Sequence, residues 1–487
     1  MWSCWWPATD ATRLRPSPRP RPVSTPRSSP GSYSTKVYDK GGSRMATDTR
    51  KYAPQRFPRS ALCIALLTAM PYAANAARLD YELGAAVMHS DNIVLRENDE
   101  ISETVFSPRL RFDFEHSSST LQSTFRGDVQ YLDYLDDVYK DDTRGEFVGA
   151  LDWTISPDRV SFMARDSLSR QSVSTLAAFT PGNQQQINVF EAGPSFFARF
   201  GQATLGQLDL RYTNSYAEET ETFNSDRYNV AARLRRETSS TAQVSLNLEA
   251  TQTEYDTISE LYDYKRYDAY VNYTSQLASL DLSVDAGYSR LQPRGGDDTS
   301  GALFRGRADW RVSPRSTFNA NLSYQFADAA QDLILRVGAP GDPGSPIIGD
   351  PDNPNLQIVP DTFKQKRANL GYQFTGVRLN LQVQPYYEQL RYLRDDAFDQ
   401  DNYGGLFSAR YEIRPQLFAT ALAARQHRQF KGIDREDKDT TLALGLASRM
   451  SRHWGAQLDY QYRKRDSSVG GQNYVENVVV LSFTYFR

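Results

Sequence analysis

Apolar and polar residues alternate along most of the chain after residue 77, with the period of two that a β-strand produces. Phe112 and Phe114, for example, fall on one face of a strand, and Arg111 and Asp113 fall on the other. One such segment is weak evidence, since half-buried strands of soluble sheets also alternate, but a long series is strong. The pattern recurs at 106–115, 147–155, 244–249, 280–288, 304–312, 318–326, 379–384 and 454–463.

The connections between these segments are short at every second junction and longer at the others. Short turns are expected near 117–119, 156–159, 200–202, 238–240, 276–278, 313–316, 375–377, 414–416 and 451–452. Longer polar loops are expected at 91–103, 134–142, 171–185, 217–222, 293–300, 328–361, 394–401, 430–439 and 466–471. One face of most strands is charged and must therefore be wet, which excludes a sealed soluble core.

An antiparallel sheet that is apolar outside, polar inside, and bounded by short turns and long loops satisfies the requirements of an outer-membrane barrel. A lipid bilayer offers no water to unpaired backbone groups, so such a sheet must close on itself. The pattern predicts an all-β fold, a single transmembrane antiparallel barrel of about 20 strands, with a range of 16–20. The barrel is expected to occupy residues 77–487, with short periplasmic turns and longer extracellular loops.

The residues before the barrel have the features of an export signal. Arg56 and Arg59 precede an apolar run over 61–70, and Ala74-Asn75-Ala76 forms a small-x-small cleavage site. We therefore predict a signal peptide at 45–76. Residues 1–44, rich in Pro, Arg and Ser, are expected to be an incorrectly assigned start upstream of Met45; the alternative is a genuine disordered leader.

Charge and composition narrow the possible partners. Loss of residues 1–76 removes 12 basic and 3 acidic residues and changes the net charge from −3 to −12, which argues against nucleic acid. The predicted partners are outer-membrane lipid, lipopolysaccharide and the barrel assembly machinery, with polysaccharide and periplasmic export components as further possibilities. Acidic loops near 136–142, 218–221 and 395–401 could bridge lipopolysaccharide through divalent cations, although solvated loop tips are the more ordinary explanation.

Little in the sequence supports catalysis. There are four histidines, none in a recognisable catalytic motif, and both cysteines lie upstream of the predicted cleavage site. No pair of histidines has the spacing of a metal site. We expect no enzymatic activity, no catalytic residues, no metal site and no cofactor.

Charged residues on the predicted inner face are the main candidates for function. Guanidinium groups pair well with carboxylates and phosphates, so they could form a track for an acidic sugar polymer. The alternative is that they pair with acidic residues on neighbouring strands and stabilise the barrel. The candidate lumen-lining residues are Arg109, Arg111, Arg126, Arg211, Arg233, Arg235, Arg305, Arg307, Asp309 and Arg311.

The loop at 328–361 is long, rich in Gly and Pro, and contains apolar residues such as Leu333 and Ile348. A loop of this length is uncommon unless it has a role or is disordered. Two alternatives follow: a constriction folded into the lumen, or a mobile flap on the surface.

Short motifs resemble those of a known family. The first strand ends in Ser90-Asp91-Asn92-Ile93, and turns at 156–158 and 313–315 have the form Ser-Pro-x. These features resemble the outer-membrane barrels called beta-barrel porin type 2, over essentially all of 78–487. The resemblance implies an outer-membrane protein associated with exopolysaccharide or capsule export, and it supplies no catalytic residues. The final strand departs from the usual aromatic end because Arg487 follows Phe486.

Two functions in the outer membrane are therefore expected. The first is a porin-like channel for export or passage of exopolysaccharide or other solutes. The second is a non-conducting barrel that anchors a polysaccharide secretion or surface-assembly system. A TonB-dependent receptor and an autotransporter fit less well, since few residues separate Ala76 from the first strand.

Overall fold

The computed structural model describes residues 77–256, 261–334 and 356–487. It contains 20 strands that alternate in direction around a closed sheet. The strands are β1 (Ala77–Ser90), β2 (Glu103–Ser117), β3 (Leu121–Tyr134), β4 (Asp142–Ser156), β5 (Val160–Ser172), β6 (Gln184–Arg199), β7 (Thr204–Ala217), β8 (Ser225–Glu237), β9 (Ala242–Tyr255), β10 (Tyr264–Gln276), β11 (Leu280–Pro293), β12 (Thr299–Ser313), β13 (Ser316–Asp328), β14 (Thr362–Thr375), β15 (Leu379–Tyr392), β16 (Gln400–Arg414), β17 (Leu417–Phe430), β18 (Arg435–Arg449), β19 (Trp454–Ser467) and β20 (Tyr474–Phe486). The described helical segments are η1 (Pro181–Asn183), η2 (Glu221–Phe223), α2 (Ala329–Ile334) and η3 (Asp396–Phe398).

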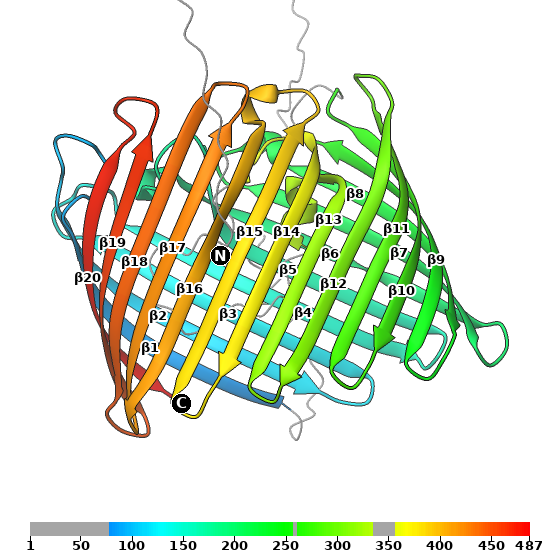
Figure 1. The fold of residues 1–487 in the computed structure, drawn as a ribbon, viewed down its shortest axis with the longest axis horizontal. Helices are drawn as coiled ribbons and strands as arrows, with labels where there is room; N and C mark the ends of the chain where they lie inside the picture. Colours follow the sequence, from blue (N-terminus) through cyan, green and yellow to red (C-terminus); the bar gives the residue numbers. More distant parts are fainter. Residues whose placement is uncertain (1–76, 257–260, 335–355) are drawn as a thin grey trace, which may run out of the picture. The chain divides into compact units, whose positions relative to one another are not determined.

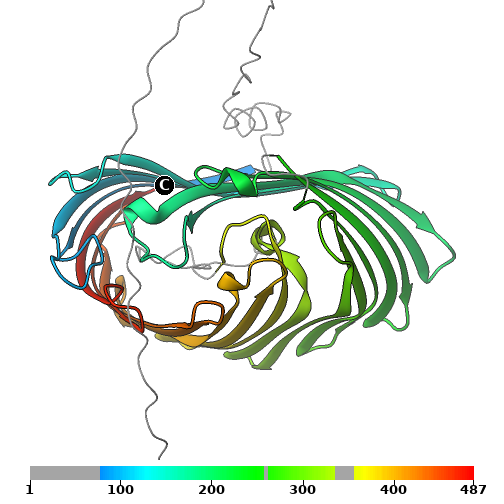
Figure 2. The same ribbon diagram turned by 90° about the horizontal axis from the view of Figure 1, so that it is seen from above.

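Every strand pairs antiparallel with its neighbours in the sequence, and β20 pairs with β1 to close the barrel (Figures 1 and 2). The closure extends to the last residue, because Tyr81 and Arg487 exchange backbone hydrogen bonds of 3.2 and 3.0 Å. A closed sheet leaves no unpaired strand edge, which is the condition for crossing the hydrocarbon layer. The predicted fold class and the predicted strand count are confirmed.

The connections form two distinct rims. The predicted short turns lie together at one rim, called here the short-turn rim, near the C-terminus; the longer loops lie at the other, the long-loop rim (Figure 1). The connection between β9 and β10 at this rim was not predicted from the sequence. The loop between β17 and β18 was predicted at 430–439, whereas β18 already begins at Arg435. Short turns face the periplasm in barrels of this kind.

Aromatic side chains on the outer surface gather near both rims, with aliphatic side chains between them. Such aromatic girdles mark the two interfaces of a membrane. Exposed aromatic residues near the short-turn rim are Trp153, Phe196, Trp310, Phe318, Tyr411 and Trp454. Those near the long-loop rim are Tyr131, Tyr216, Tyr228, Tyr267, Tyr288, Tyr387 and Tyr403.

Some predictions concern residues outside the described ranges. The signal peptide at 45–76 and the segment 1–44 both lie there, so these assignments stay predictions. Within the described ranges, no helix has the length and apolar character needed to cross a membrane.

Candidate channel lumen

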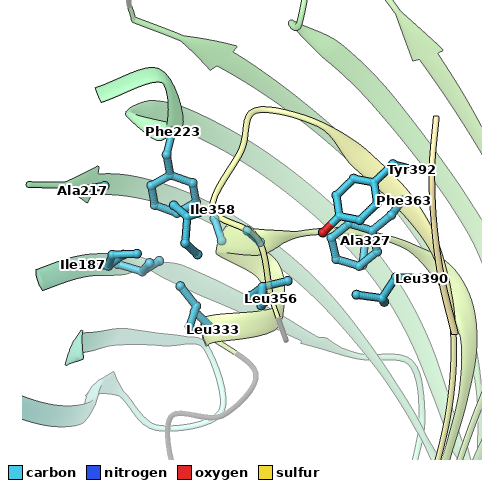
Figure 3. Packing of buried hydrophobic residues seen from close by; sticks show 13 residues of the cluster. Ile187, Ala217, Phe223, Ala327, Leu333, Leu356, Ile358, Phe363, Leu390 and Tyr392 are labelled. Carbon is cyan, nitrogen blue, oxygen red and sulfur yellow. The ribbon is translucent and has the colours of Figure 1, made fainter. Parts of the chain in front are cut away.

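An apolar partition lies inside the barrel, formed by α2 and residues 356–361. Leu333 of α2, Leu356 and Ile358 are 4%, 1% and 0% exposed. They lie between Ile187 of β6 on one side of the lumen and Leu390 of β15 on the other (Figure 3). The two alternatives for loop 328–361 were a constriction folded into the lumen and a flap on the surface. Residues 328–334 and 356–361 are folded into the lumen, and residues 335–355 lie outside the described ranges.

Buried charged groups attach the start of this partition to the barrel wall. The Asp328 carboxylate accepts hydrogen bonds from Arg227 of β8 and Tyr264 of β10, and from the backbone N–H of Gln331 at 2.8 Å. Arg227 and Asp328 are both buried. A buried charge is tolerated when it is paired and hydrogen-bonded, so these contacts fix the position of α2.

Two more side chains of α2 continue the attachment. Gln331 accepts a hydrogen bond of 2.5 Å from Arg266 of β10. Asp332 pairs with Arg367 of β14 at 2.9 Å, and Arg367 also binds Glu388 of β15. Polar contacts therefore join α2 to strands on opposite sides of β13. Seen along the barrel, α2 lies within the ring of strands (Figure 2).

The loop between β5 and β6, residues 173–183, also crosses the lumen. The backbone N–H and the hydroxyl of Thr175 donate to Gln357 Oε1 of the partition at 2.9 and 2.8 Å. On the far wall, Arg435 donates to the Leu176 carbonyl at 2.6 Å, and Arg428 donates to the Thr175 carbonyl at 3.4 Å. This loop therefore joins the partition to β17 and β18 and narrows the lumen at the long-loop rim.

Beside the partition a cavity of about 830 Å³ remains, lined by residues of β1–β6 and β16–β20. Its lining extends from Gln416, in the turn between β16 and β17, to Phe179 and Pro181 in the crossing loop. These residues belong to opposite rims, so the cavity follows the axis of the barrel.

The cavity lining contains seven arginines and three carboxylates. The carboxylates are Asp80, Glu82 and Asp113, and each has an arginine within 3.5 Å. The arginines are Arg109, Arg111, Arg144, Arg170, Arg410, Arg449 and Arg463. Five of them pair with carboxylates: Arg109 with Asp128, Arg111 with Glu82 and Asp128, Arg144 with Asp142, Arg170 with Glu146, and Arg463 with Glu476. Arg410 and Arg449 have no carboxylate partner in the described part of the chain and supply the surplus positive charge.

Of the ten predicted lumen residues, the structure places Arg109 and Arg111 in the lining of this cavity. The other eight lie on β3, β7, β8 and β12, outside that lining. Most pair with neighbours: Arg126 with Asp113, Arg211 with Asp209, Arg233 with Asp209 and Glu249, Arg305 with Gln325 and Asp285, Arg307 with Asp309, and Arg311 with Asp281. Arg235 donates to Gln207 at 3.4 Å. Pairing across neighbouring strands was the alternative left open from the sequence, and most of these contacts are of that kind, whereas Arg211–Asp209 and Arg307–Asp309 each lie within one strand.

Sequence analysis did not select five of the lining arginines. Arg410 alternates with the exposed Phe407 and Tyr411, and Arg449 follows the exposed Leu444 and Leu446 in the same manner. That alternation places both guanidinium groups on the inner face. The alternation could therefore have identified Arg410 and Arg449 as inward-facing from the sequence. It does not show which part of the lumen is filled and which is open.

Two other titratable groups, His427 and Asp361, lie near the long-loop rim. No group of three metal-ligating side chains occurs within the described ranges. His427 contacts Tyr403 Oη at 2.5 Å and Glu436 at 2.8 Å, joining β16, β17 and β18. At the end of the long loop, burial raises the pKa of the Asp361 carboxyl, while hydrogen bonds from the backbone N–H groups of Arg394 and Asp395 oppose the shift.

A closed antiparallel barrel with aromatic girdles, a polar lumen and two unlike rims is an outer-membrane β-barrel. The chain is accordingly a protein of the outer membrane. The family described as "Putative beta-barrel porin 2" matches residues 403–486, so the predicted resemblance is confirmed over β16–β20. No curated protein matches the sequence.

Several solved structures are similar to this chain over most of its length. The FrpB iron transporter from Neisseria meningitidis is 9% identical with a TM-score of 0.40, over 83% of this chain and 82% of that one. The siderophore receptor PirA from Pseudomonas aeruginosa is 13% identical with a TM-score of 0.41, over 84% and 80%. A loop-deletion mutant of OmpT from Vibrio cholerae is 11% identical with a TM-score of 0.32, over 85% and 100%. Similarity at this level carries no information about the solute.

Proposed function

We propose that the protein is a porin-like channel for the export or passage of acidic exopolysaccharide or other anionic solutes. The observation that carries the proposal is the cavity beside the partition, whose lining reaches both rims and has a surplus of guanidinium groups. A lumen lined by charged and polar side chains stays hydrated, which a passing ion or sugar requires.

The dimensions of the cavity fit a single sugar chain. A strand of 14 residues rises ~3.4 Å per residue and tilts by ~45°, so 830 Å³ corresponds to a mean cross-section of about 25 Å² for the centres of water-sized solutes. Adding the ~1.4 Å radius of water gives a passage roughly 8 Å wide. A mean width of this size is large enough for an extended unbranched polymer.

The polymer, as distinct from small anions, is favoured by the chemistry of the lining. Neutral hydrogen-bonding side chains alternate there with the arginines; among them are Ser107, Gln130, Thr420, Gln457, Ser482 and Thr484. Such groups can exchange hydrogen bonds with sugar hydroxyls as a chain moves past. The resemblance to barrels associated with exopolysaccharide export supports the same solute.

One observation favours the second function, a non-conducting docking barrel. The partition and the crossing loop together occupy much of the lumen and are fixed by buried contacts. If they close the cavity fully in the membrane, the barrel can serve only as an anchor for other components.

Polymer block of ionic current separates these functions. The full-length protein, purified from outer membranes, would be placed in a planar bilayer and exposed to the host's acidic exopolysaccharide. A neutral dextran of matched size is the control. We expect steady current that the acidic polymer blocks more strongly than dextran does. Equal block by the two polymers would argue against an anionic solute, and absence of current in a folded barrel would favour the docking function.

A further inference from the structure

Two arginines near the short-turn rim of the cavity differ from the other arginines in its lining. Arg410 of β16 and Arg449 of β18 have no carboxylate within ion-pair distance in the parts of the chain that are described. Each lies over an aromatic ring instead: Arg410 at 4.3 Å from the ring centre of Phe418, and Arg449 at 5.2 Å from that of Phe486. All four side chains line the cavity.

An aromatic ring holds a guanidinium group in place without neutralising its charge. The planar group can then present its N–H edges to a carboxylate in a two-pronged hydrogen bond. One donor of Arg449 is already used, since it binds the Arg452 carbonyl at 3.1 Å. Arg410 and Arg449 are therefore positioned cations whose charge is left for a solute.

The surroundings of the two arginines suit a sugar more than a simple ion. Thr420 of β17 and Gln457 of β19 line the cavity, on strands that adjoin those of Arg410 and Arg449. Gln416 joins them from the two-residue turn between β16 and β17, where it adopts a φ of 72° that favours glycine.

We propose that this mouth of the cavity is a binding site for uronate-containing sugars, in which Arg410 and Arg449 bind carboxylates and the neutral side chains bind hydroxyls. The inference rests on the proposed channel function and adds to it the class of solute and the place where the solute enters. Because the short-turn rim faces the periplasm, the site would capture an acidic chain at the start of export.

The test uses a tetramer of galacturonic acid as the probe and maltotetraose as its uncharged counterpart. Block of current is measured with each sugar added from either side of the bilayer. Binding to the same protein in detergent is measured by isothermal titration calorimetry, which does not require that the barrel conducts. The variants are Arg410→Gln and Arg449→Gln, with Arg199→Gln as control. Arg199 lies at the same rim, at the end of β6, outside the cavity lining.

We expect the acidic tetramer to bind and to block from the periplasmic side. Each of the two variants should weaken its binding about tenfold, the usual effect of losing one charge-assisted hydrogen bond, and Arg199→Gln should leave it unchanged. Equal binding of the two sugars, or equal affinities in all variants, would overturn the assignment of this site. If the acidic tetramer binds in calorimetry but the barrel passes no current, the channel function is contradicted and the assignment of the binding site is not.

Discussion

A cysteine at Gly84 tests whether the cavity beside the partition is the conducting path. Gly84 of β1 lines the cavity, and a Cβ there would lie 3.5 Å from the Phe483 carbonyl and 3.6 Å from Thr484 Oγ1, which is ordinary contact. Residues 77–487 contain no cysteine, so the new thiol is the single one in the barrel. The adjacent Leu83→Cys is the matched control, since Leu83 is 50% exposed on the outer surface.

The size of the effect follows from the dimensions of the cavity. With a mean radius of ~4 Å, estimated from 830 Å³ over the barrel height, an ethylsulfonate group attached to the thiol reaches across the passage. A unit charge ~5 Å from a passing anion changes its energy by ~1 kcal/mol in a water-like medium. The anionic adduct should therefore pass up to about tenfold less anion current than a trimethylammonium-ethyl adduct of similar size, and the difference should shrink in high salt.

The assay is the current of each variant in a planar bilayer before and after the two methanethiosulfonate reagents, with labelling checked by mass. Both adducts at Gly84→Cys should at least halve the current, and neither should change it at Leu83→Cys. A fully labelled Gly84→Cys protein with unaltered current would show that ions take another route.

Further predictions concern the inner face, the partition and the long loop. The sequence alone predicts that Arg305→Ser, Arg307→Ser and Arg311→Ser together shift selectivity toward cations. Because these residues lie outside the cavity lining, we expect a smaller shift of the reversal potential than for Arg109→Ser with Arg111→Ser. Asp328→Asn leaves the buried Arg227 without its carboxylate, a loss of roughly 3–5 kcal/mol. The heat-induced unfolding temperature of the barrel on gels should fall, while the exposed control Asp297→Asn leaves it unchanged. Burial raises the pKa of Asp361, so its ionised form destabilises the folded protein as pH rises from ~4 through that pKa. Asp361→Asn should therefore raise the unfolding temperature at pH 8 and have little effect near pH 4; an effect of equal size at both values would contradict this account.

The barrel itself could be predicted because its determinants are local. A strand that faces lipid on one side and water on the other must alternate, and turns such as Ser313-Pro314-Arg315 mark its ends. The connection between β9 and β10 was missed because Leu261 and Tyr262 are large apolar residues and not turn formers.

The interior of the barrel could not be predicted in the same way. The pattern places Arg227 on the inner face, but its partner Asp328 lies 101 residues further along the chain. Alternation reports the face of a strand and carries no information about what lies across the lumen. The positions of the partition and the crossing loop decide which part of the lumen is open. They therefore also decide that Arg410 and Arg449 line the open part.

The most direct test of the central claim is the reversal potential of the purified protein in a planar bilayer under a salt gradient. A conducting path whose surplus charges are Arg410 and Arg449 should give steady current with a reversal potential on the anion-selective side. That potential should move toward zero in the double variant Arg410→Gln, Arg449→Gln. Current that is absent, or that is cation-selective and indifferent to these two substitutions, would contradict the account.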